Sequence, residues 1–113
     1  MMRDTVRLDL LYEEKNLILN SLNELRNDLL SQDRDITIIN DILIKFIDTN
    51  KVELDRYEIN IIINALNKVR TDMKNRNEYP RDINELILKL INENSKKKVL
   101  SRIMRVDNGR KKR

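Results

Sequence analysis

The residue types that could do chemistry in this chain are acidic and basic, because the sequence contains neither histidine nor cysteine. Imidazole and thiolate metal sites, disulfide bonds and histidine-based catalysis are therefore excluded. Carboxylates stand near one another at Glu24 and Asp28 and at Asp82 and Glu85, but a cation site needs several acids that converge inside a fold. Their expected places, on polar helix faces and at helix starts, favour capping and helix-dipole interactions instead. We expect no enzymatic activity, no metal site and no cofactor.

Basic residues gather at the C-terminal end. From Glu93 onward the sequence has nine Lys or Arg and two acidic residues, whereas residues 1–92 carry 14 basic and 17 acidic side chains. Apolar residues recur at helical spacing in the same segment. This pattern predicts that residues 97–106 form a short helix or extend a helix that precedes them. Such a segment could contact nucleic-acid phosphates, an acidic partner or an anionic membrane surface, or remain a solvated end. The side chains concerned are Lys96, Lys97, Lys98, Arg102 and Arg105.

An internal repeat in the sequence predicts the structural elements that would position these side chains. Residues 5–48 align without gaps on residues 49–92, at an offset of 44, with fourteen identical positions. The matches concentrate in two separate blocks, residues 16–23 with 60–67 and residues 39–47 with 83–91. Two blocks that share one offset predict a duplicated structural unit.

Each unit predicts two helices, because its apolar residues recur at spacings of three and four. Asp55 and Glu58 have the spacing of a capping box, and Pro80 suits the first turn of the fourth helix. One Gly, one Pro and four aromatic residues argue against a β-sandwich or barrel. We therefore predict an all-α fold in which a tandem duplicated helical hairpin forms a four-helix bundle. The predicted domains are a bundle over residues 1–92, with hairpins at 5–48 and 49–92, and a basic helix or tail over 93–113.

Four apolar residues lie off the main apolar face of their helices. They are Leu17 and its counterpart Ile61, and Ile44 and its counterpart Leu88. A bundle helix that touches two neighbours needs a wide apolar arc, which is one explanation for them. The alternative is a second apolar surface for a partner protein or for self-association.

These features predict a non-catalytic helical binding protein that occupies a surface on a larger protein, as an inhibitor, adaptor or regulator does. Such a composition is typical of small proteins of phages and mobile elements. The alternative is a nucleic-acid-binding accessory protein that uses residues 96–113, and a homo-oligomer built through the apolar strips is a third hypothesis. Because no apolar run approaches a membrane span or a secretion signal, we expect a cytoplasmic location.

Overall fold

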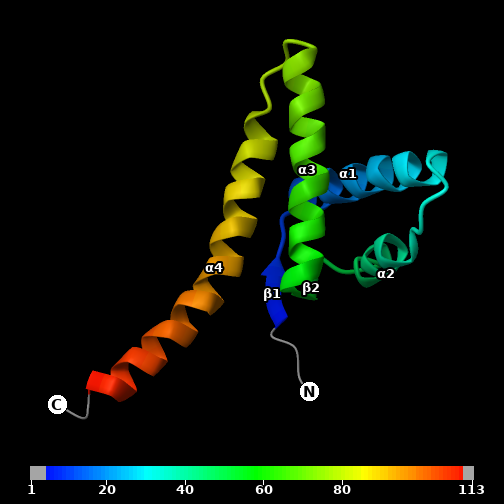
Figure 1. The fold of residues 1–113 in the computed structure, drawn as a ribbon. Helices are drawn as coiled ribbons and strands as arrows, with labels where there is room; N and C mark the ends of the chain where they lie inside the picture. Colours follow the sequence, from blue (N-terminus) through cyan, green and yellow to red (C-terminus); the bar gives the residue numbers. More distant parts are fainter. Residues whose placement is uncertain (1–4, 111–113) are drawn as a thin grey trace.

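The computed structural model describes the backbone of residues 5–110 and the side chains of residues 5–95 (Figure 1). It is mostly helical, with four helices and a small sheet of two strands. The elements follow one another along the chain as β1 (Thr5–Asp9), α1 (Tyr12–Ser31), α2 (Thr37–Lys45), β2 (Lys51–Asp55), α3 (Arg56–Asn75) and α4 (Arg81–Arg110).

The two strands form an antiparallel ribbon, so the all-α prediction is wrong. Leu8 lies opposite Val52 in the register, and Thr5 lies opposite Asp55. Apolar and polar residues alternate along both strands, with Val6, Leu8, Val52 and Leu54 buried. That period of two is typical of a strand with one buried face. A five-residue strand is stable only when it pairs and packs, and here the partner lies 46 residues further along the chain.

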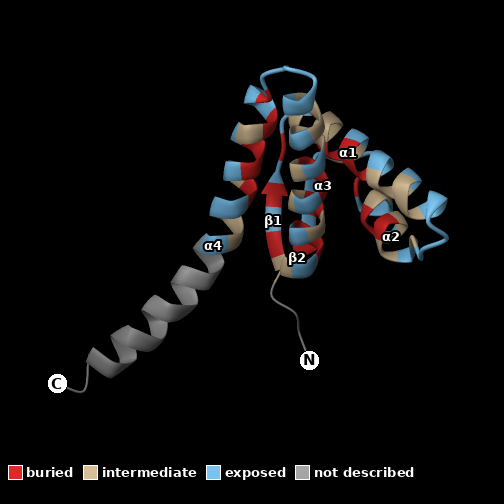
Figure 2. Cartoon of the chain, turned by 45° about the horizontal axis from the view of Figure 1, so that its top comes forward, coloured by how far each residue is buried: buried red, intermediate tan, exposed pale blue. Residues whose placement is uncertain are grey.

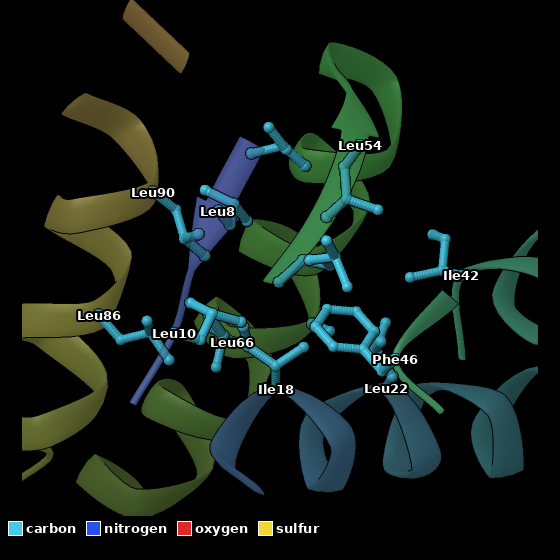
Figure 3. Packing of buried hydrophobic residues seen from close by; sticks show 14 of the residues in the cluster. Leu8, Leu10, Ile18, Leu22, Ile42, Phe46, Leu54, Leu66, Leu86 and Leu90 are labelled. Carbon is cyan, nitrogen blue, oxygen red and sulfur yellow. The ribbon is translucent and has the colours of Figure 1, made fainter. Parts of the chain in front are cut away.

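The helices pack on the inner face of the ribbon as well as on one another, and this arrangement replaces the predicted four-helix bundle. In Figure 1, α3 and α4 run side by side while α1 crosses α3. The burial pattern places the core between the ribbon and the helices (Figure 2). Figure 3 shows Leu8, Leu10 and Leu54 of the ribbon segments among side chains from all four helices. The fully buried large side chains are Leu8, Ile18, Leu22, Ile39, Ile42, Phe46, Leu54, Ile59, Ile62, Leu66, Leu86 and Leu90.

The ends of the helices follow local signals in the sequence. The predicted capping box is confirmed, because Asp55 accepts a hydrogen bond from the Glu58 amide at 2.8 Å and its own amide donates to Glu58 Oε1 at 2.9 Å. Pro80 immediately precedes α4, and its carbonyl accepts a hydrogen bond from the Asn84 amide. Helix α4 runs on to Arg110 and so includes residues 97–106, which were predicted either as a short helix or as an extension of the preceding one.

Residues that are 44 positions apart have matching environments in many places. Helices α1 and α3 are both 20 residues long and begin 44 residues apart. Ile18 and Ile62 are both fully buried. The Arg26 side chain donates to Asn40 Oδ1 at 2.8 Å, and Arg70 donates to Asn84 Oδ1 at 3.3 Å. In each hairpin, the same hydrogen bond therefore ties the first helix to the second.

Candidate functional site

The outer face of the ribbon is charged and exposed. Its solvent-facing side chains are Arg7 and Asp9 on β1 and Lys51 and Glu53 on β2. The register places Arg7 opposite Glu53 and Asp9 opposite Lys51. Basic and acidic groups therefore alternate both along each strand and across the ribbon, and their formal charges cancel.

The pairing in the ribbon stays the same when each residue is exchanged for the residue 44 positions away in the sequence. Leu8 lies opposite Val52, which is its own counterpart at that offset. Arg7 corresponds to Lys51, and Asp9 corresponds to Glu53. Because the register pairs Arg7 with Glu53 and Lys51 with Asp9, a two-fold rotation at the Leu8–Val52 pair exchanges like charges.

The four charged side chains of this outer face are available for binding. Within residues 5–95, no hydrogen bond or ion pair to another described residue engages the side chains of Arg7, Asp9, Lys51 or Glu53. Guanidinium and ammonium groups donate hydrogen bonds, and carboxylates accept them. The ribbon thus presents both donors and acceptors on one small, solvated surface.

Two ion pairs join helices of different hairpins. Lys45 on α2 contacts Glu58 on α3 at 2.7 Å, and Lys89 on α4 contacts Glu14 on α1 at 2.7 Å. Lys89 also donates to the carbonyl oxygen of Asp9, at the end of β1. Glu58 and Glu14 are counterparts, as are Lys45 and Lys89, so each ion pair joins a residue of one hairpin to a residue of the other.

Lys89 also affects the titration of the carboxylate that it contacts. Burial alone would raise the pKa of Glu14, but the hydrogen bond from Lys89, the hydrogen bond from the Leu11 amide and the charge of Lys89 together lower it. Close to the α2 start, hydrogen bonds from the Thr37 hydroxyl and amide lower the pKa of the exposed Asp35. Both carboxylates are thus favoured in the ionised form that their hydrogen-bond donors require.

The four apolar residues predicted to bind a partner fall into two groups. Leu17 and Ile61 are partly buried and pack against the core. Ile44 and Leu88 are 61% and 60% exposed, and each has a second exposed isoleucine three residues further along. The exposed apolar residues on the second helices of the two hairpins are Ile44 and Ile47 near the end of α2 and Leu88 and Ile91 on α4.

Leu17 and Ile61 line two grooves that occupy corresponding places. The groove at Leu17 has a volume of about 520 Å³, and the groove at Ile61 has a volume of about 480 Å³. Three further pairs of counterparts line them, namely Glu13 with Tyr57, Asn20 with Asn64 and Asp82 with Ile38. The first groove also contains Glu14 and Glu85, whereas the second contains Leu25 and Leu29. The first groove is therefore lined by four carboxylates, whereas the second has one basic and one acidic side chain, Arg34 and Asp35, beside its apolar residues.

The predicted basic contacts lie outside the described side chains. They are Lys96, Lys97, Lys98, Arg102 and Arg105. Their backbone belongs to α4.

Sequence reasoning missed the ribbon and its charged outer face. The signal was present, because Thr, a basic residue and an acidic residue recur at alternate positions in both halves. These triplets are Thr5, Arg7 and Asp9 and, 44 residues later, Thr49, Lys51 and Glu53. In each half, the alternation covers only five residues just before a predicted helix. That length is too short to distinguish a strand from the segment that leads into the helix.

Comparisons with protein-family models, with curated proteins and with solved structures find no match for this chain. Within the described residues, no group of three or more acidic side chains is placed to hold a metal ion. Nor does any described helix have the length and apolar character needed to cross a membrane.

Proposed function

We propose that this protein is a non-catalytic DNA-binding protein whose ribbon enters the major groove of duplex DNA. The observation that carries the proposal is the exposed ribbon itself, with charged side chains directed away from the core. The major groove is about 12 Å wide and admits a two-stranded antiparallel ribbon as well as a helix. Strands about 4.8 Å apart fit that width with side chains on the outer face.

The symmetry of the ribbon supports the proposal. We infer that the chain is two copies of a 44-residue strand–helix–helix unit, joined in one polypeptide and related by an approximate two-fold axis. The reciprocal ion pairs Lys45–Glu58 and Lys89–Glu14 and the central pair Leu8–Val52 support this relationship. Duplex DNA has two-fold symmetry in its backbones, and proteins with two like halves bind sites with two like half-sites.

The long-range attraction to DNA would come from another part of the chain. The four charges on the outer face of the ribbon cancel, but residues 93–113 carry nine basic and two acidic residues. We propose that this segment contacts phosphates and supplies the affinity that does not depend on sequence. Such binding weakens steeply as salt rises, because each phosphate contact releases counterions.

The experiment measures binding of the full-length chain to duplexes of about 20 base pairs, two helical turns, selected from a random pool. Fluorescence anisotropy at about 50 and 200 mM salt gives the affinity. The double variant Arg7→Ala/Lys51→Ala is expected to lose about 30-fold or more in affinity for the selected duplex, since each good base contact contributes roughly 1–3 kcal/mol.

The matched control is Arg34→Ala/Lys74→Ala, which removes the same two side-chain types at exposed positions. Lys74 lies in the last turn of α3 and Arg34 in the loop that follows α1, and both helices start beside the ribbon and are about 30 Å long at 1.5 Å per residue. The control is expected to bind within a few-fold of the wild type. Failure of the full-length chain to bind any duplex at about 50 mM salt, or equal losses in both variants, would contradict the proposal.

A second candidate function is contact with another protein through the exposed apolar residues of α2 and α4. Ile44 and Leu88 are each about 60% exposed, and such residues add unfavourable hydration unless something covers them. We propose that they occupy a surface on a larger protein. The variant Ile44→Asp/Leu88→Asp is expected to keep wild-type circular dichroism and DNA affinity while losing that partner.

Light scattering of the wild type and this variant at micromolar concentration distinguishes a partner from self-association. A wild-type monomer that carries no copurifying protein would contradict the second candidate. A wild-type oligomer that dissociates in the variant would assign the same residues to contacts between copies.

A further inference from the structure

The two halves of the ribbon are not chemically identical, and the difference lies in the residues that would reach the bases. Arg7 on β1 corresponds to Lys51 on β2, and Asp9 corresponds to Glu53. Arginine has five donors in a planar fork, whereas lysine has a single rotating ammonium group. The acidic pair differs by one methylene group only.

The alternating charges on the outer face match one kind of base pair. In the major groove, guanine presents two acceptors, N7 and O6, and cytosine presents the N4 amino donor. Arginine and lysine donate to guanine, and aspartate and glutamate accept from cytosine. Asparagine and glutamine are the side chains that pair with adenine, and neither type faces outward between Thr5 and Asp9 or between Lys51 and Asp55.

The spacing of the two basic residues also suits base pairs that are two steps apart. Arg7 and Lys51 lie on opposite strands at diagonal positions of the register. Diagonal neighbours are about 7–8 Å apart, which is about two base-pair steps of 3.4 Å. Basic residues in this arrangement would therefore reach one guanine on each side of the centre of the site.

We propose that the ribbon reads a central pair of G·C base pairs, one in each half-site, and that the half-site facing Arg7 is read more strictly than the half-site facing Lys51. The proposal rests on the proposed DNA-binding function and adds the substrate class. The preferred site is then an imperfect palindrome, because Arg7 contacts one half-site and Lys51 contacts the other. A bidentate arginine–guanine contact discriminates by about 5- to 150-fold against the wrong base, and a lysine contact gives a smaller factor.

The test uses the full-length chain and its best selected duplex, in which each central G·C pair is replaced by A·T in turn. For the wild type, the two replacements are expected to lower affinity unequally, by about 5- to 150-fold in one half and several-fold less in the other. Two variants keep the formal charge and change one reader each. Arg7→Lys is expected to reduce the larger loss to the level of the smaller one, and Lys51→Arg to raise the smaller loss to the level of the larger one.

The outcomes separate this inference from the function on which it rests. Equal losses in the wild type, a selected site without central G·C pairs, or losses that neither variant changes would overturn the inference. If Arg7→Ala/Lys51→Ala weakens all duplexes by one common factor, the ribbon binds DNA without reading G·C pairs. The proposed function then stands and the inference fails. If the wild type does not bind duplex DNA, both the proposed function and this inference are contradicted.

Discussion

The two halves of the chain keep the same internal contacts but expose different surfaces. Residues 5–48 and 49–92 share the Arg–Asn hydrogen bond within each hairpin and the Lys–Glu ion pair between hairpins. By contrast, the groove at Leu17 is acidic, whereas the groove at Ile61 has one acidic and one basic side chain among its lining residues. The residues of the Arg–Asn and Lys–Glu contacts are identical in the two halves, whereas several residues that line the grooves differ. The differences are thus free to serve binding.

The largest expected effect tests whether the two halves contribute equally to the core. Leu22 and Leu66 are counterparts, and both are fully buried. Leu22→Ala and Leu66→Ala should each lower the free energy of unfolding by about 2–5 kcal/mol, because each leaves a cavity in a packed core. Urea unfolding followed by circular dichroism measures the change.

Leu30→Ala is the control for these two substitutions, since Leu30 is 46% exposed and should cost less than about 1 kcal/mol. A loss at Leu66 several times larger than the loss at Leu22 would show that the halves differ in the core as well as on the surface.

A smaller effect is expected from the two ion pairs, and it should be unequal. Glu58 is more deeply buried than Glu14, with side-chain exposures of 6% and 19%. Lys45→Met should cost about 1–3 kcal/mol, because it leaves the Glu58 carboxylate buried beside only its capping contact with the Asp55 amide. Lys89→Met should cost less, since Glu14 is better solvated. Unfolding in urea measures both.

Lys68→Met is the control for the ion pairs, because Lys68 contacts Asp28 in a pair whose side chains are both more than a third exposed. An exposed pair of this kind contributes about 0–1 kcal/mol. A cost for Lys45→Met no greater than that of the control would mean that burial does not distinguish the two kinds of pair.

The parts of this fold that depend on neighbouring residues could be predicted from the sequence. The Asp55–Glu58 capping box and the helical faces that contain Ile18 and Ile62 follow from spacing alone. The matching bounds of α1 and α3 agree with the 44-residue offset found in the sequence.

The ribbon depends on contacts between distant residues, and this is why it was missed. Val6, Leu8 and Leu10 alternate with polar residues, but Leu10 and Leu11 run on into α1 and hide the end of the strand. The hydrogen bond from the Leu10 amide to the Asn50 carbonyl joins two segments that no local pattern connects. The candidate site on the outer face exists only because of that pairing, so the sequence alone did not indicate it.

The smallest expected effect concerns the acid stability of the contact between Glu14 and Lys89. Burial would raise the pKa of Glu14, yet Lys89 and the Leu11 amide lower it overall. In the unfolded chain a glutamate titrates near about 4.3. Because the folded-state pKa is the lower one, the stability that ionised Glu14 contributes is fully present above that value. It is lost as the pH falls through the folded-state pKa.

Glu14→Gln should therefore be less stable than the wild type at neutral pH and lose less stability between about pH 5 and pH 3. Urea unfolding at several pH values measures both slopes, with Glu13→Gln as the control because Glu13 is an exposed carboxylate on the same helical turn. The control should follow the wild type. If Glu14→Gln also follows the wild type down to about pH 3, the contact with Lys89 does not stabilise the ionised carboxylate. The two reciprocal ion pairs would then differ in kind, since only Lys45–Glu58 would hold one hairpin against the other.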